Sequence, residues 1–333
     1  MHFFHIHLDR PLAIASPQSI PHTRRQRAAP GSALSPRPMP HTPTTMPHTP
    51  TTMSTAPQAW QQVAMGLRAQ QWWYFLVLPA AGLPVATWHR PTLPLLTALL
   101  HGAVVAGGCL GFAYAVNGLV ERHTDRDPRK NPWIGQPLAK NSAQLLGLLA
   151  AATALLAFAA GGDAPMAALT SLAAGAFYSL GPRVKARLLL GTGTNVLIFA
   201  PLLLVAPGAE LSIRLAAWAA TFSALLLQNQ LVHEQADAGE DAAAGDPSTA
   251  TWLGPQRTRW VLATFGGVAA AAPWLALPHC AAAAMGCAAV LATAATCSAA
   301  KPARRRMLQR RVVLVGATVA FSAEILASSL GLS

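Results

Sequence analysis

Nine apolar stretches, each close to the length that crosses a membrane, follow one another from residue 72 to residue 330. A helix of about 20 apolar residues spans the hydrocarbon core of a bilayer. Only 11% of the residues are charged and the mean hydropathy is +0.36, whereas soluble domains are about 25% charged. The sequence therefore predicts an all-α fold, a polytopic membrane bundle of about nine transmembrane helices. The stretches cover residues 72–88, 93–117, 142–160, 165–180, 188–205, 211–230, 260–277, 279–298 and 312–330.

The distribution of Lys and Arg predicts how this bundle is oriented. The loops after the second, fourth, sixth and eighth stretches hold most of these cations, whereas the opposite loops and adjoining helix ends hold only Arg90 and Arg214. Cytoplasmic loops are enriched in Lys and Arg. We therefore expect an integral multi-pass protein of the bacterial cytoplasmic membrane with a cytoplasmic N-terminus. The formal charge of +12 then reflects topology, and we expect no nucleic-acid partner.

Residues 1–65 differ in composition from the rest of the chain. The first sixty residues hold eleven prolines and a tandem heptad, Met-Pro-His-Thr-Pro-Thr-Thr, at 39–45 and 46–52. Such a segment cannot bury enough apolar surface to fold. We predict that residues 1–65 are disordered and that residues 66–333 form the transmembrane domain. A further hypothesis is that translation starts later than Met1, since Met39, Met46, Met53 and Met65 all precede the first apolar stretch.

Two short acidic clusters interrupt the apolar sequence and hold eight of the twelve acidic residues. In the first, Asn117, Glu121 and Asp125 recur every four residues. In the second, Asp237 and Asp241 follow the same spacing. Side chains four residues apart share one face of a helix. Two carboxylate faces at a membrane boundary predict that both contribute to binding a divalent metal ion.

A third polar segment, residues 178–187, adds Tyr178, Arg183 and Lys185 on the same predicted side of the membrane. Mg²⁺ prefers oxygen ligands and is often held by one or two carboxylates together with substrate phosphates. Lys and Arg bind the remaining phosphate oxygens. These residue types suit a diphosphate that leaves an allylic lipid, because metal and cations stabilise the charge that develops on the leaving group.

The three segments, from about Leu67 to the C-terminus, resemble the UbiA superfamily of intramembrane prenyltransferases. That family carries an N-x-x-x-D-x-x-x-D motif, a tyrosine-to-lysine segment and a D-x-x-x-D motif followed by a glycine and a threonine. The resemblance implies a nine-helix fold and Mg²⁺-dependent transfer of a prenyl group from an isoprenoid diphosphate to an aromatic or other lipophilic acceptor in the membrane. It leaves the acceptor, the prenyl chain length and the oligomeric state open.

Residue roles follow from this resemblance. It implies that Asn117, Glu121, Asp125, Asp237 and Asp241 bind Mg²⁺ and that Asp125, Asp237 and Asp241 are catalytic. It also implies that Asn117, Arg129, Lys130, Tyr178, Arg183 and Lys185 bind the diphosphate. Gly245 and Thr249 match the end of the second motif, where we expect them to shape the loop.

The chain departs from the family pattern at several positions. Glu121 stands where aspartate is usual, Gly118 replaces a residue that is commonly polar, and Asp246-Pro247 occupies a stretch that is often basic. These departures keep open a non-catalytic family member or one with altered substrate use. A membrane transporter for an anionic solute is the alternative from another class. It would need polar residues continuing across the spans.

Few polar residues lie inside the predicted spans. Glu324 and His101 are isolated there, and we expect both to be satisfied groups of the bundle interior. For His233 a role as a base and a structural hydrogen bond are both open. The aromatic residues near span ends are expected to form interfacial belts; these are Trp72, Trp73, Tyr74, Trp88 and Trp260.

Overall fold

The structure is a computed structural model that describes residues 59–89, 92–123, 125, 128, 131–138, 140–180, 184, 189–244 and 248–332, with the backbone alone for 240–244. All of them belong to one compact unit, Ser54–Ser333. We predicted that residues 1–65 are disordered, and residues 1–58 of that segment lie outside the described residues. The last residues of that segment are helical, because α1 begins at Ala59 and its buried Gln62 donates from Nε2 to the Pro137 carbonyl at 2.6 Å.

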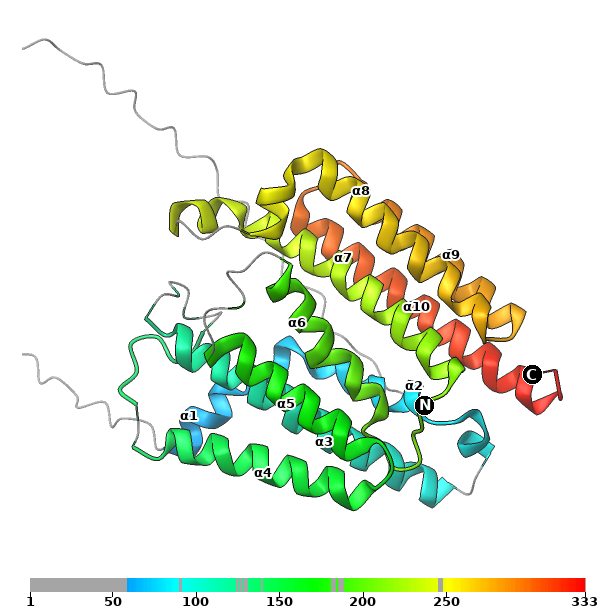
Figure 1. Ribbon diagram of the computed structural model, residues 1–333, viewed down its shortest axis with the longest axis horizontal. Helices are drawn as coiled ribbons and strands as arrows, with labels where there is room; N and C mark the ends of the chain where they lie inside the picture. The colour runs from blue at the N-terminus through cyan, green and yellow to red at the C-terminus, as the bar shows by residue number, and fades with distance from the viewer. Residues whose placement is uncertain are drawn as a thin grey trace, which may run out of the picture. The chain divides into compact units, whose positions relative to one another are not determined.

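The described residues form helices and contain no strand, which confirms the predicted all-α class (Figure 1). The α-helices are α1 (Ala59–Gly66), α2 (Leu78–Gly82), α3 (Thr92–Glu121), α4 (Ser142–Ala160), α5 (Ala164–Leu180), α6 (Leu190–Phe199), α7 (Ile213–Ala244), α8 (Thr249–Ala271), α9 (His279–Cys297) and α10 (Pro302–Ser329). Short 3₁₀ segments are η1 (Ala69–Gln71), η2 (Trp73–Val77), η3 (Val85–His89), η5 (Ala200–Leu204) and η6 (Ala272–Leu275).

Within the described part of the chain, five helices are long and apolar enough to cross a membrane. They are α3, α4, α9, α10 and residues Ile213–Gly239 of α7. Three shorter apolar helical segments, Trp73–Gly82, Ala164–Leu180 and Leu190–Leu204, add to them. Each of the nine predicted stretches therefore falls on helical structure, although several are shorter than a complete span.

The first predicted stretch, residues 72–88, is divided into η2, α2 and η3 rather than forming one helix. Leu83, which follows α2, is extended, with φ −66° and ψ 138°. The residue before a proline is disfavoured in the helical region, and Pro84 follows Leu83. Proline thus ends α2 and prevents a continuous helix.

Close contacts of small residues hold the helices together. A Cβ atom on Gly175 of α5 would lie 2.7 Å from the Ala113 Cβ of α3, and one on Gly316 of α10 would lie 2.0 Å from the Ala288 Cβ of α9. Small residues let backbones approach in membrane bundles. The helices α3, α4 and α5 consequently pack together, as do α9 and α10 (Figure 1).

The two largest of five apolar clusters make up most of the core. The first is built mainly on α3, α5 and η5 and includes Trp72, which is only 6% exposed. The expectation that Trp72 belongs to an interfacial belt is therefore wrong, because the break before η2 turns this side chain into the bundle. The second cluster joins α7, α9 and α10.

Candidate functional site

A cavity of about 610 Å³ lies where the C-terminal ends of α3 and α5 meet α6, α7, α10 and the segment that precedes α2. Its lining includes the carboxylates Glu121, Asp125 and Asp237. Other polar lining residues are Arg68, Gln70, Gln71, Tyr74, Tyr114, Asn117, Tyr178, Asn195, Asn229, Gln230, His233, Arg306 and Arg310. The cavity therefore gathers residues of both acidic clusters with cations, amides and phenols.

The first acidic cluster is ordered along the last turns of α3. Asn117 donates from Nδ2 to Glu121 Oε2 at 2.8 Å, as the four-residue spacing on a helix allows. Ser179, near the end of α5, donates to Asn117 Oδ1 at 3.4 Å. Asn117 thus links α3 to α5 while it orients the Glu121 carboxylate beside the cavity.

Asp125 lies just beyond α3 and is held by Asn131. The Asn131 side chain is 0% exposed and donates from Nδ2 both to Asp125 Oδ2 at 2.9 Å and to the Gly118 carbonyl at 2.8 Å. Its Oδ1 accepts from the Trp133 backbone amide at 3.1 Å. Sequence reasoning missed Asn131 because a loop asparagine before a proline reads as a turn residue.

The glycine at position 118 has a steric explanation. A Cβ at Gly118 would lie 2.9 Å from Trp133 Cδ1 and 3.2 Å from Asn131 Oδ1. A residue with a side chain at this position would displace the Asn131 and Trp133 loop. The absence of a side chain at Gly118 therefore allows the close packing of Asn131, which in turn holds Asp125.

The second acidic cluster divides between two roles. Asp237 lines the cavity, and its Oδ2 lies 3.1 Å from His233 Nδ1, one turn earlier on α7. Glu234 instead accepts from the Thr192 hydroxyl at 2.9 Å and from the Ala250 backbone amide at 3.0 Å. Glu234 therefore anchors the start of α8, both of its oxygens accept hydrogen bonds, and it does not line the cavity.

Thr249 has the structural role that the sequence predicted for it. It accepts a hydrogen bond from the Leu189 backbone amide at 3.2 Å and shares one with Thr192 at 3.1 Å. These bonds join the start of α6 to the start of α8. Gly245 lies outside the described residues.

Some predicted site residues cannot be compared with the structure. Arg129, Lys130, Arg183 and Lys185 lie outside the described residues, and Asp241 is described only as part of the α7 backbone. Tyr178 is described and lines the cavity from α5. Of the predicted residues with described side chains, Asn117, Glu121, Asp125, Tyr178 and Asp237 all meet at this one cavity.

The structure adds a buried cation that sequence reasoning missed. Arg68 lies between α1 and η1, is 9% exposed and places its guanidinium 5.7 Å from the centre of the Tyr114 ring. Burial lowers the pKa of Arg68, while Tyr114, Asp125 and Glu121 act in the opposite direction. Arginine nevertheless remains charged in proteins. The sequence signal that could have identified Arg68 is its position just before the apolar stretch at 72–88. A charge at such a position can face either water or a site inside the bundle.

The donor set fits a magnesium ion that is bound together with phosphate oxygens. Among the described side chains, no group of three His, Cys, Asp or Glu residues is placed to hold a metal ion. Mg²⁺ commonly takes one or two protein carboxylates and completes its shell with substrate phosphates and water. Glu121, Asp125 and Asp237 around a common cavity provide this kind of incomplete protein shell.

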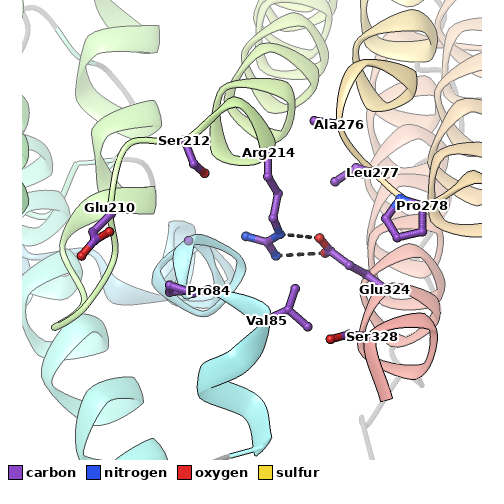
Figure 2. A pocket seen from close by; sticks show the side chains of 11 residues that line it. Pro84, Val85, Glu210, Ser212, Arg214, Ala276, Leu277, Pro278, Glu324 and Ser328 are labelled. Atoms are coloured by element: carbon purple, nitrogen blue, oxygen red, sulfur yellow. Dashed lines mark hydrogen bonds and ion pairs between the residues drawn. The ribbon is translucent and has the colours of Figure 1, made fainter. Parts of the chain in front are cut away.

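A second cavity, of about 530 Å³, lies at the start of α7, where the Arg214 guanidinium faces the Glu324 carboxylate of α10 (Figure 2). Arg214 Nη2 donates to Glu324 Oε2 at 2.9 Å, and its Nε donates to Oε1. Nη1 lies 3.3 Å from the Leu83 carbonyl. Glu324 is thus a satisfied interior group, as expected. His101 is also satisfied, with Nε2 at 2.9 Å from the Leu156 carbonyl.

Comparison with known proteins supplies the family context. The sequence profile of the UbiA prenyltransferase family matches residues 64–322. No curated protein matches the chain in a direct sequence comparison.

Solved structures agree with this match. A UbiA homologue from Archaeoglobus fulgidus, bound to DMAPP and Mg²⁺, is 18% identical, covers 78% of this chain and 98% of its own, and superposes with a TM-score of 0.62. The same comparison with the homologue bound to GPP and Mg²⁺ gives a TM-score of 0.61. A structure described as that of digeranylgeranylglyceryl phosphate synthase in membranes is 11% identical, covers 80% and 98% of the two chains, and gives 0.63. At these identities the structural likeness shows the fold.

Proposed function

Because the chain belongs to the UbiA prenyltransferase family, we propose that it transfers a prenyl group from an isoprenoid diphosphate to a lipophilic acceptor and requires Mg²⁺. One observation carries this proposal. Carboxylates from both acidic clusters, Glu121, Asp125 and Asp237, line a single cavity that also has an apolar wall. Such a cavity can hold a metal-bound diphosphate and its hydrocarbon tail together.

The proposed metal site uses the carboxylates of Glu121, Asp125, Asp237 and Asp241. Bound Mg²⁺ would neutralise the charge that develops on the diphosphate as the C–O bond breaks. Asn117 and the buried Asn131 act on this site by fixing the Glu121 and Asp125 carboxylates. Preorganised ligands of this kind require little rearrangement when the substrate arrives.

The proposed phosphate partners are basic side chains. We assign this role to Arg129, Lys130, Arg183 and Lys185, which follow Asp125 and Tyr178 closely in sequence, and add Arg68. The Arg68 guanidinium is buried at the cavity beside Tyr114. Hydrogen bonds between a guanidinium and phosphate oxygens are charge-assisted and strong.

The apolar part of the cavity would hold the prenyl chain. Phe75 and Phe199 contact each other there with ring centroids 4.5 Å apart, and Ile198 and Leu226 extend the same wall. Such a wall keeps water from the allylic cation, and aromatic faces attract a cation. The acceptor can then capture the cation before water does.

We further propose that the protein resides in the bacterial cytoplasmic membrane with this cavity facing the cytoplasm. The five long apolar helices support membrane integration. The orientation is supported by the concentration of Lys and Arg in the loops next to the two acidic clusters.

The test is a transfer assay on purified protein in neutral detergent with Mg²⁺, a series of prenyl diphosphates and a panel of lipophilic acceptors. Diphosphate release and prenylated product are followed by mass spectrometry. We expect that Asp125→Asn and Asp237→Asn abolish turnover without preventing membrane insertion. The matched control is Glu210→Gln, which removes an exposed carboxylate beside the second cavity and should leave turnover unchanged. Absence of turnover with every pair, together with solute flux in liposomes, would favour a transporter.

A further inference from the structure

Two arginines of α10, Arg306 and Arg310, line the cavity from a helix that carries neither acidic cluster. Because they are four residues apart, they project from the same face of α10. The Arg310 guanidinium lies 5.3 Å from the centre of the Tyr74 ring, and its side chain is exposed. Arg306 is less exposed, and its Nε is buried without a hydrogen-bond partner in the described part of the chain. A buried donor without a partner is costly, which points to an acceptor atom from a ligand.

The charge of this pair is not balanced by its own helix. Glu324 is the single acidic residue of α10; it is paired with Arg214 and lies about 27 Å along the helix from Arg306. Across the cavity, Asp237 attracts Arg306 while Arg310 repels it. Asp237 is also in contact with His233. An anion between the two guanidiniums would relieve their repulsion, and the planar fork of arginine matches a carboxylate or phosphate.

The location favours an amphiphile over a second inorganic group. Both arginines lie in the first, basic turns of α10, after which the helix is apolar, so the pair sits at a boundary between a polar and an apolar zone. Tyr74 and Phe75 line the neighbouring wall. Of the predicted diphosphate cations, in contrast, Arg129 and Lys130 follow Asp125 in sequence, and Arg183 and Lys185 follow Tyr178.

We propose that Arg306 and Arg310 bind the anionic head group, a carboxylate or a phosphate, of the acceptor, so that the acceptor is an acidic amphiphile. This inference rests on the proposed function, because it assigns the second substrate of the same cavity. It predicts that acceptor binding depends on α10, whereas donor binding depends on the carboxylates of α3 and α7.

The experiment measures thermal unfolding of the full-length protein in dodecyl maltoside with three single-chain probes: dodecyl phosphate, dodecanoate and neutral dodecanol. We expect at least one anionic probe to raise the Tm without Mg²⁺, and dodecanol to raise it less. Arg306→Gln with Arg310→Gln should weaken the apparent Kd of that probe by about tenfold or more per arginine. The control Arg304→Gln with Arg311→Gln removes the same charge from exposed positions of α10 and should leave the Kd unchanged.

A parallel titration with geranyl diphosphate and Mg²⁺ separates this inference from the proposed function. Stabilisation by that donor should survive in the Arg306→Gln, Arg310→Gln variant and be lost in Asp125→Asn, whereas the anionic probe should still stabilise Asp125→Asn. Loss of the donor effect in the α10 variant would assign the pair to the diphosphate and overturn the inference. An equal effect of all three probes, or equal loss in the control variant, would also overturn it. If geranyl diphosphate with Mg²⁺ stabilises neither the unchanged protein nor any variant, the result would instead count against the proposed function.

If the double variant does not fold, Arg310→Gln alone serves, because that side chain is exposed. The expected result is the same direction of change, with about a tenfold weaker Kd for the anionic probe. An unchanged Kd in a folded Arg310→Gln protein would contradict the assignment.

Discussion

Asn131 donates a hydrogen bond to Asp125 Oδ2 at 2.9 Å and a second one to the Gly118 carbonyl at 2.8 Å, so one buried amide ties the loop to the end of α3. Asp125 follows the end of α3, and its backbone amide donates to the Glu121 carbonyl at 2.9 Å, while Asn131 holds its side chain. The carboxylate at the end of the first motif is therefore oriented by a residue outside that motif.

We expect Asn131→Ala to raise the Mg²⁺ concentration for half-maximal turnover, because Asp125 loses its fixed orientation. It should also lower stability by about 1–3 kcal/mol, since buried polar groups lose their partner. Mg²⁺ titration of diphosphate release and thermal unfolding provide the two measurements. Gln62→Ala removes another buried, hydrogen-bonded amide and should affect stability alone. Equal Mg²⁺ dependence in the two variants would show that Asn131 is only structural.

Gly118→Ala should destabilise the protein by about 1–3 kcal/mol, as expected when a methyl group is forced into packed surroundings. Its Cβ would lie 2.9 Å from Trp133 Cδ1. The control is Gly147→Ala on α4, which is exposed and has nothing within 4 Å of the added Cβ. Alanine there should be neutral or stabilising by up to about 1 kcal/mol. Similar thermal unfolding of both variants would contradict the steric explanation.

Glu121→Gln tests whether this carboxylate contributes charge or only a hydrogen bond. Glutamine can still accept from Asn117, so stability should change little. Loss of the charge should raise the half-saturating Mg²⁺ concentration by about tenfold or more. Glu234→Gln is the comparison, because both Glu234 oxygens accept hydrogen bonds around the start of α8. An unaltered Mg²⁺ titration in Glu121→Gln would mean that this position does not bind the metal ion.

Arg214→Met should destabilise the protein by about 3–5 kcal/mol, because it leaves Glu324 buried without its ion partner. Adding Glu324→Leu should recover most of that loss, since an apolar pair of similar size needs no partner. Turnover per folded molecule should be unchanged, because Arg214 lies about 35 Å along α7 from Asp237. Thermal unfolding and specific activity are measured on the same preparations. If the single variant unfolds at the normal temperature, the pair contributes little to stability.

Much of the fold could be predicted because membrane-spanning helices appear in the sequence as long apolar segments. The runs at 93–117, 142–160 and 279–298 coincide closely with α3, α4 and α9, since a bilayer requires long apolar segments. The first run was harder, because hydropathy does not register how Pro84 interrupts a helix. The start of α8 was also missed, because residues 249–259 are too polar to stand out as a span.

For the site, the four-residue spacing identified Asn117, Glu121, Asp125 and Asp237, which all line one cavity. Spacing within a helix is a local property, so the sequence carries it directly. The same spacing selected Asp237 and not Glu234, but only the position of α8 shows that Glu234 accepts a hydrogen bond from the Ala250 backbone amide. His233, left open between two roles, lies beside Asp237 in the cavity lining.

By itself, the sequence determined the all-α class, the apolar helices and the two carboxylate faces, because helical periodicity and hydropathy act over a few turns of one segment. Only the tertiary structure decided which cations and amides join them. Arg68, Asn131 and the α10 pair Arg306 and Arg310 come from separate parts of the chain. Their approach to the carboxylates depends on how helices pack, which no local pattern of residues encodes.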